Sequence, residues 1–441
     1  MAKAQNILSM FGKILLTIII ITIFEFIALV LVTMIPQEKI KIHVTESADI
    51  LLEDTVFFYL NKNDISSRID RYADSILLNI AYSYDNEHPI KSVACSSYYY
   101  NNTQNENQNL KDAVSANLHP NTDYLRYWHG SNIIVKPLLL FTNINGIYAI
   151  NALVIIILLT FLLILLQQRL NKGTSICLLV ACATVSIWYV PFSLEYTWSI
   201  IIMLLAGILS FSIYNKKPVT YICFFVIIGN ITAYFDFLST ETLTFTIPII
   251  CILLLKDKEH LLHNTQNYFT LTIKAGLSWL TGYISAWIMK WTVASIILQT
   301  NAFQLALHQA NTRITGEVEN ISFFNQALGA LVRNVSCLFP FSYIQGQSFM
   351  IALTTAGIIA IFYYLFRDSH NTTLPMVLCM IASIPFVRFV LISNHSYLHY
   401  FFTYRAQLAS IFAFGLAIIY GIDYHLLKKE LRKICKRTKK S

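Results

Sequence analysis

Two acidic residues in the N-terminal part of the chain have the type and spacing needed for proton transfer. Asp70 and Asp74 lie four residues apart in the run from Ile69 to Ile80, so on a helix they share one face. A carboxylate held in this way can act as a general base toward a hydroxyl group within hydrogen-bond reach. We expect Asp74 to be the catalytic base, with Asp70 as the alternative. The competing interpretation is an ordinary solvated helix face.

Cationic and aromatic side chains cluster at the end of the same segment. The sequence places Arg126, Trp128, His129 and Lys136 within a short stretch. Arginine and histidine suit a phosphate group, and tryptophan suits a sugar face or a membrane interface. We interpret the four as substrate-binding residues. The alternative is an aromatic belt with its usual basic neighbours.

Several ionisable or polar residues fall at or near the ends of apolar runs that the charge pattern places on the same side of a membrane. They are Glu195, Asp236, Lys290, Arg388, His395, His399 and Arg405. An ionisable residue inside a span is costly and indicates function. A mixed layer of this kind would suit the anionic headgroup of a phosphorylated lipid. The alternative for the cations is that they reach outward to the nearest interface.

The spacing of His395 and His399 is also found in zinc sites on helices. No third ligand occurs at a fixed offset, so we assign no metal site, although a divalent metal at the acidic residues stays open. The sequence contains no phosphate-binding glycine loop, Gly-x-Ser-x-Gly or His-Glu-x-x-His motif, which argues against ATP hydrolysis.

The elements that must position these residues are predominantly apolar. Of 441 residues, 56% are hydrophobic and only 13% are charged, whereas soluble proteins carry about 25% charged residues. The apolar runs predict an all-α polytopic membrane protein with ten spans of about 20 residues each. We expect an anchor helix at 1–35, a mixed, mainly helical outer segment at 36–136, helices two to seven at 137–298, a second outer loop at 299–347, helices eight to ten at 348–427 and a basic tail at 428–441.

The positions of lysine and arginine predict the orientation. Each short loop assigned to the inside carries one of them, and the short outer loops carry none. Both termini are therefore expected in the cytoplasm and the active face outside, in a plasma-membrane protein. Eight of the 32 Lys and Arg residues lie at 428–441, where they indicate orientation and contact with anionic lipid rather than nucleic-acid binding.

This layout resembles the GT-C-fold glycosyltransferases, multispan enzymes that take a sugar from a polyprenyl-phosphate donor. The shared features are a first span, a large outer loop with an acidic residue on a short helix, and many further spans. The segments Tyr124–Ser131, Tyr234–Leu238 and Asn394–Arg405, the last containing Tyr404, look like those of bacterial membrane proteins of the same layout.

The resemblance implies a bacterial cell-envelope enzyme with a lipid-linked sugar donor. Asp74 or Asp70 would match the first-loop acid, and Lys290, Arg388 or Arg405 would match the cations that hold the carrier phosphate. Tyr404 joins the substrate-binding residues. The adjacent acidic pair that is frequent in that loop is absent here.

Two further function classes stay open. A transporter or flippase would bind its substrate near the bilayer midplane, often between related halves, but no internal repeat is evident. A membrane scaffold without catalytic activity is the other. The sequence leaves the sugar, the acceptor and the oligomeric state undetermined.

Overall fold

The protein is almost entirely helical. The computed structural model describes residues 2–62, 64–262, 264–315, 321–339, 345–369 and 372–438. Helices account for 78% of the structure. The named strands of the described residues, β1 (Phe57–Tyr59) and β2 (Arg68–Asp70), form one antiparallel pair in which Phe57 lies opposite Asp70. The predicted all-α class is confirmed.

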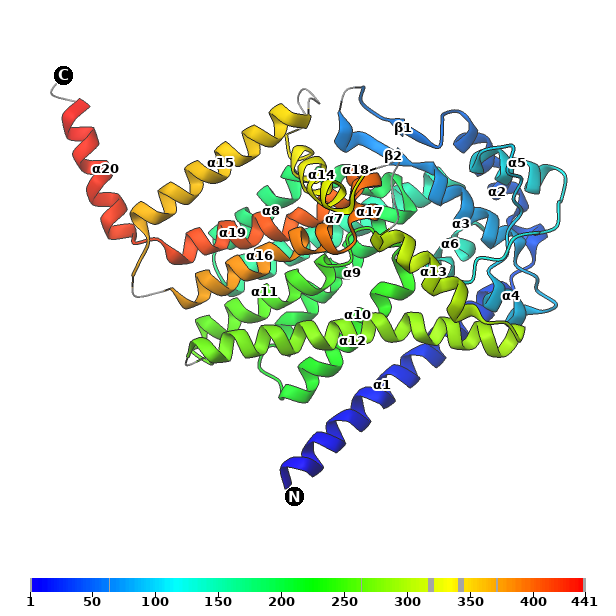
Figure 1. The fold of residues 1–441 in the computed structure, drawn as a ribbon, viewed down its shortest axis with the longest axis horizontal. Coiled ribbons are helices and arrows are strands. Elements are labelled where there is room, and N and C mark those ends of the chain that lie inside the picture. Colours follow the sequence, from blue (N-terminus) through cyan, green and yellow to red (C-terminus); the bar gives the residue numbers. More distant parts are fainter. Residues whose placement is uncertain are drawn as a thin grey trace.

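The outer segment is a small helical layer at one end of the molecule (Figure 1). It follows α1 (Ala2–Thr33) and contains α2 (Gln37–Leu52), η1 (Ile65–Ser67), α3 (Arg71–Ser83), α4 (Pro89–Cys95), α5 (Glu106–Ser115) and α6 (Asn132–Leu138). Its core forms where Ile40, Val44, Leu78 and Leu110 pack together. This apolar contact holds α2, α3 and α5 against each other, so the segment can present its residues to the bundle.

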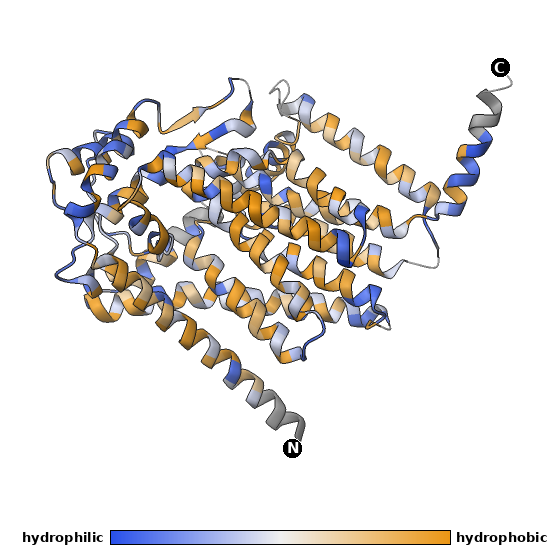
Figure 2. Cartoon of the chain, turned by 180° about the vertical axis from the view of Figure 1, so that it is seen from behind, coloured by the Kyte–Doolittle hydropathy of each residue, from blue (hydrophilic) through white to orange (hydrophobic). Residues whose placement is uncertain are grey.

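The rest of the chain forms the apolar bundle. Its first half comprises α7 (Ile144–Arg169), α8 (Lys172–Thr184), η2 (Ile187–Phe192), α9 (Leu194–Ile213), α10 (Pro218–Phe235), α11 (Leu243–Lys258) and α12 (Thr265–Leu298). Its second half comprises α13 (Ala302–Thr315), α14 (Phe323–Ser336), α15 (Gln345–Phe366), α16 (Thr373–Leu391), α17 (Ser393–Leu398), α18 (Tyr400–Thr403), η4 (Tyr404–Ala406), α19 (Gln407–Gly421) and α20 (Tyr424–Thr438). Figure 2 shows hydrophobic helices in the middle and hydrophilic residues concentrated in the outer segment and in α20.

Seven helices in the described part of the chain are long and apolar enough to cross a membrane. They are Ser9–Thr33, Ile144–Arg169, Leu194–Ile213, Pro218–Phe235, Gly346–Phe366, Thr373–Leu391 and Tyr400–Gly421. They coincide with seven of the ten predicted spans. Their number and length give the chain the character of a membrane protein.

The other three predicted spans, on α8, α11 and α12, are not confirmed as spans. Helices α8 and α11 have 13 and 16 residues, which corresponds to about 20 and 24 Å, less than the roughly 30 Å hydrocarbon core. Helix α12 is longer, but its many Trp, Tyr, Thr and Ser residues lower its hydropathy. Helix α11 is instead buried on all sides, as expected for a helix inside a large bundle.

Two predicted segments differ in detail from the structure. The tenth span was expected to run unbroken from Leu398 to Tyr424, but it divides into α18, η4 and α19, and α20 is a separate helix. The second outer loop contains α13 and α14. Residues 316–320 and 340–344 of that loop and 439–441 of the basic tail lie outside the described residues.

Helices α10 and α12 approach so closely that two glycines are required. A Cβ at Gly282 would lie 1.9 Å from the carbonyl oxygen of Val226, and one at Gly229 would lie 1.9 Å from that of Trp279. Small residues at such contacts let helix backbones pack directly in membranes. The α10–α12 pair therefore forms a rigid side of the bundle.

We expect Gly282→Ala to lower the thermal midpoint of the purified protein, because the added methyl must push the two helices apart. Overpacking of this kind costs about 1–3 kcal/mol. The matched control is Gly357→Ala, since no atom lies within 4 Å of a Cβ at Gly357. If both variants have the same thermal midpoint in detergent as the wild type, α10 and α12 are not in close contact.

Candidate active site

A cavity between the outer segment and the bundle gathers many of the predicted site residues. This acid cavity has a volume of about 70 Å³ and is lined by Asp70, Tyr72, Ala73, Ile76, Leu77, Tyr124, Tyr127, His129, Glu195, Phe237, His395 and His399. Since one water needs roughly 10–15 Å³ of such volume, the cavity has room for several hydroxyl-sized groups. Two carboxyl groups and three imidazole rings gather in it among aromatic side chains.

Asp70 reaches this cavity from the junction of β2 and α3. Its carboxylate caps α3 by accepting a hydrogen bond from the backbone amide of Ala73 at 2.9 Å. Asp70 is therefore not on the helix face shared with Asp74 that the sequence predicted. Burial raises the pKa of Asp70 to about 6, although the Ala73 amide, a hydrogen bond with Glu195 and the charge of Arg68 each lower it.

Glu195, in the first turn of α9, shares a hydrogen bond with Asp70. Two buried carboxyl groups this close cannot both ionise readily, because their like charges repel each other. The pair can therefore accept or release a proton inside the acid cavity. The structure brings these two predicted residues together although 125 positions separate them in the sequence.

Asp74 is buried beside the acid cavity but does not line it. Its carboxylate accepts hydrogen bonds from the Leu194 amide at 2.8 Å, from the Ser193 hydroxyl at 3.4 Å and from the Tyr148 hydroxyl. Burial and the nearby charge of Asp70 raise the pKa of Asp74 to about 7, against these hydrogen bonds. The hydrogen bonds of Asp74 thus hold α3 against α7 and against the start of α9. Of the two aspartates, Asp70 is the one that lines the cavity.

Three histidines complete the polar wall of the acid cavity. The rings of His395 and His399 lie 4.7 Å apart, and the His129 ring lies 5.4 Å from that of Phe237. Burial, together with the charges of Lys290 and Arg126, holds the pKa of His129 well below its usual range, so this ring is neutral. Within the described residues no group of three or more His, Cys, Asp or Glu side chains is arranged to hold a metal ion.

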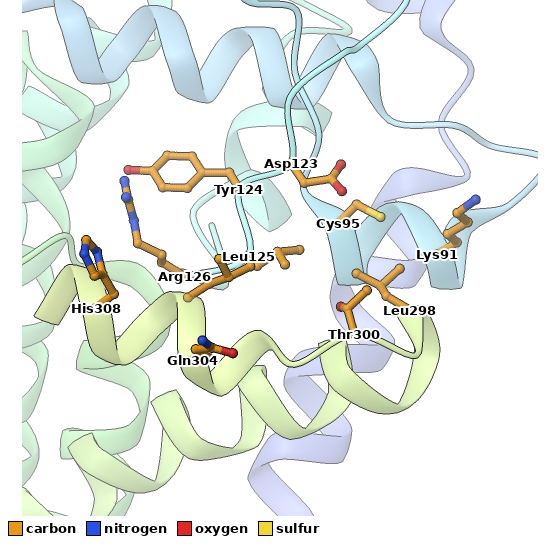
Figure 3. Close-up of a pocket in the computed structure, with 11 residues that line it drawn as sticks. Lys91, Cys95, Asp123, Tyr124, Leu125, Arg126, Leu298, Thr300, Gln304 and His308 are labelled. Carbon is orange, nitrogen blue, oxygen red and sulfur yellow. The ribbon is translucent and has the colours of Figure 1, made fainter.

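A larger cavity lies on the other side of Tyr124. This outer pocket, of about 710 Å³, is lined by Lys91, Cys95, Asp123, Tyr124, Leu125, Arg126, Leu298, Thr300, Gln304, Leu305 and His308. Figure 3 shows Arg126 extended beside the Tyr124 ring, with His308 near it and Lys91 on the opposite side. The Arg126 guanidinium lies 4.5 Å from the centre of that ring. The outer pocket therefore offers cations to an anionic ligand.

Tyr124 lines both cavities, so the two adjoin at this side chain. Its ring lies 4.7 Å from that of His129 on the acid-cavity side. A ligand whose anionic group occupies the outer pocket would therefore extend past Tyr124 to bring its next group to Asp70.

The three cations expected inside the spans are directed into the protein, where protein groups engage them. Lys290 donates to the carbonyl oxygens of Val93 and Ala94 at 2.8 and 3.1 Å, which caps the end of α4. Arg405 donates to the carbonyl oxygens of Ser66 and Phe401 at 2.7 and 3.2 Å. These contacts tie the outer segment to the bundle.

Arg388 is paired with an acidic residue. It donates to Glu241 through Nε at 2.8 Å and through Nη2 at 3.3 Å, and both side chains are 5% exposed. Asp236 lies beside this pair and accepts from the Ser239 amide at 3.0 Å. Burial and the charge of Glu241 raise the pKa of Asp236 to about 7. Arg388 and Asp236 do not line either cavity.

The remaining predicted site residues lie apart from both cavities. The indole of Trp128 donates to the Ala286 carbonyl at 2.7 Å, and the Tyr404 hydroxyl donates to the Val185 carbonyl at 2.9 Å. Lys136 is fully buried, 5.0 Å from the centre of the Tyr84 ring, and its ammonium has no hydrogen-bond partner among the described residues. Burial lowers the pKa of Lys136 to about 7.

Several residues that line the cavities or pair with the predicted ones were not predicted from the sequence. They are Tyr72, Tyr127, Phe237, Glu241, Lys91 and His308. Tyr127 and Phe237 were inside segments already quoted for the resemblance, and Glu241 lies in the same short loop as Asp236. Lys91 and His308 had no local signal, because only the fold brings α4 and α13 together.

Comparison with protein-family models, curated proteins and solved structures found no match to this chain.

Proposed function

We propose that this protein is a membrane glycosyltransferase that moves a sugar from a polyprenyl-phosphate donor to a lipid- or polymer-linked acceptor outside the cytoplasm. The observation that carries the proposal is the buried pair of Asp70 and Glu195 in a cavity that shares Tyr124 with a pocket lined by Arg126 and Lys91. A base next to a cationic pocket suits group transfer from a phosphorylated carrier.

In the proposed reaction, Asp70 takes the proton from the acceptor hydroxyl in the acid cavity. The acceptor oxygen forms a bond to the anomeric carbon of the donor sugar, and the bond from that carbon to the phosphate oxygen breaks. The electron pair leaves with the phosphate. Arg126 and Lys91 stabilise the resulting negative charge in the outer pocket, because cations pair strongly with phosphate oxygens.

The aromatic walls support this substrate class. Tyr72, Tyr127 and Phe237 line the same cavity as the carboxyl pair. Such walls combine large apolar contact with a few directed polar groups, which suits a sugar ring with hydroxyls along its edge. Residues of the outer segment line both cavities. This segment covers one end of the bundle (Figure 1), where a membrane-anchored donor could present its headgroup.

The test is transfer of a radiolabelled sugar in proteoliposomes supplied with polyprenyl-phosphate sugars and extracted acceptor lipid. We expect Arg126→Gln to reduce kcat/KM for the donor by about tenfold to a hundredfold, since hydrogen bonds to charged groups are worth about 1.5–3 kcal/mol. Loss of the positive charge should lower kcat, because the charge on the departing phosphate is less stabilised, and should also raise the donor KM.

Lys111→Gln is the control, because Lys111 is a cation of the outer segment that pairs with Asp49 away from both cavities. An unchanged donor dependence in Arg126→Gln would contradict the phosphate role of the outer pocket. Movement of the lipid-linked sugar across the membrane without chemical transfer would replace the proposal by the flippase alternative.

A further inference from the structure

Helix α15 lies apart from the other membrane-crossing helices. In α15, no residue of the most apolar stretch is buried. In the most apolar stretches of α9 and of the span Tyr400–Gly421, 67% and 72% of the residues are buried. Figure 1 shows α15 along one side of the bundle, next to α20 at the end opposite the outer segment. Something other than the described protein must cover this helix in a bilayer.

A groove separates α15 from the bundle. It has a volume of about 760 Å³ and is lined by Gly173, Ile176, Cys177, Val180, Ala356, Ile359, Ala360, Tyr363, Cys379, Ile411, Phe414, Gly415, Ala417, Ile418 and Ile419. These residues come from α8, α15, α16 and α19, and nearly all are apolar. On the α15 side, Ala356 and Ala360 are small residues that leave space next to the bundle.

The groove suits a hydrocarbon chain better than water. An apolar cavity gives water no hydrogen-bond partners and stays dry. From Ala356 to Tyr363 the α15 wall extends for about 10 Å along the helix axis. An acyl chain lying against this wall would replace the contacts that α15 lacks with the bundle.

The mouth of the groove is basic. Lys172 immediately precedes Gly173 in the lining, and Arg367 follows Tyr363 by one helical turn. Both are exposed, as are Lys428, Lys429 and Arg432 on α20, which contacts α15. The acidic residues nearby are partly engaged: Asp423 caps α20 through the amides of His425 and Leu426, and Glu430 pairs with Lys433.

We propose that this groove binds one anionic phospholipid of the leaflet next to α20. The acyl chains lie between α15 and the helices α8, α16 and α19. The headgroup phosphate contacts Arg367, Lys172 and the cations of α20. A cation near a membrane surface contributes about 1 kcal/mol, or about fivefold in binding, toward an anionic lipid. The lipid joins α15 to the bundle and does not depend on the proposed sugar transfer.

Native mass spectrometry of the full chain in detergent tests the proposal, with phosphatidylglycerol and phosphatidylcholine titrated separately. We expect one phosphatidylglycerol to bind more tightly than phosphatidylcholine. Ala360→Trp should abolish this binding by filling the groove, and Arg367→Gln should weaken it by about fivefold while leaving phosphatidylcholine binding unchanged.

The matched control is Ile358→Trp, on the opposite, exposed face of α15. If Ala360→Trp does not fold, Ala356→Leu fills the same groove with a smaller side chain. Equal binding of the two lipids, or full retention of phosphatidylglycerol in a folded groove-filling variant, would overturn the proposal. Dimerisation on delipidation, blocked by Ala360→Trp, would also overturn it, because a second copy would then occupy the groove.

Discussion

Asp70→Asn is expected to lower the rate of sugar transfer by about 10²–10⁴-fold, the usual effect of removing a general base. Asparagine keeps the shape of the side chain, and its carbonyl oxygen can still accept the hydrogen bond from the Ala73 amide in the first turn of α3. The variant should therefore fold and reach the membrane. The rate is measured as transfer of radiolabelled sugar in proteoliposomes, normalised to the amount of protein.

The pH dependence gives a second readout of the same residue. Asp70 acts as a base only when deprotonated, and its pKa is about 6. In the wild type, kcat/KM should therefore rise as the pH increases from about 5 to about 7, and this rise should be lost in Asp70→Asn.

Asp49→Asn is the control, since Asp49 is an exposed carboxylate of the outer segment that forms an ion pair with Lys111. It should keep both the rate and the pH profile. Asp74→Asn should keep the pH rise even if it lowers protein stability, because Asp74 fastens helices rather than facing the cavity. A fully active Asp70→Asn would remove Asp70 as the base.

Arg388→Ala is expected to destabilise the protein by about 3–5 kcal/mol, the cost of leaving one member of a buried ion pair without its partner. The substitution leaves the Glu241 carboxylate buried at 5% exposure without its cation, and it removes the bonds from Arg388 to Ser396 and to the Leu238 carbonyl. The effect should appear as a lower thermal midpoint in detergent and a lower yield from membranes.

Removing both charges separates the ion pair from general loss of packing. Arg388→Met combined with Glu241→Leu should recover much of the stability, because apolar replacements of a buried pair are often neutral. Lys433→Ala breaks an exposed pair with Glu430 and should cost about 0–1 kcal/mol. If Arg388→Ala alone has the same thermal midpoint as the wild type, the ion pair between Arg388 and Glu241 is not formed.

The sequence by itself determined the class of the protein and most of its segments. Apolar runs such as Ile144–Arg169 are long because each must cross a hydrocarbon layer, so hydropathy alone finds them. The outer segment at 36–136 was recognisable because its polar composition interrupts these runs. The same reasoning could not separate a span from a buried interior helix such as α11, since both are uniformly apolar.

The sequence also found many of the residues around the acid cavity. Glu195, His395 and His399 were conspicuous because polar and ionisable groups at the ends of apolar runs are costly. Asp70 was selected by its spacing from Asp74, and His129 by its cationic and aromatic neighbours. Residue type could not decide which buried groups face a cavity and which serve other protein groups. By residue type, Lys290, Arg388 and Arg405 were equally suited to bind phosphate. In the fold, Lys290 caps α4, Arg388 pairs with Glu241, and Arg405 binds a carbonyl group of the outer segment.

Only the tertiary structure shows which of Asp70 and Asp74 lines the acid cavity. The two residues were indistinguishable by type and burial pattern, and a regular helix would have placed them on one face. In the folded protein α3 begins after Asp70, which turns that carboxylate toward Glu195, while Asp74 meets Tyr148 and the start of α9. Such pairings depend on contacts between segments far apart in the chain, and local spacing carries no information about them.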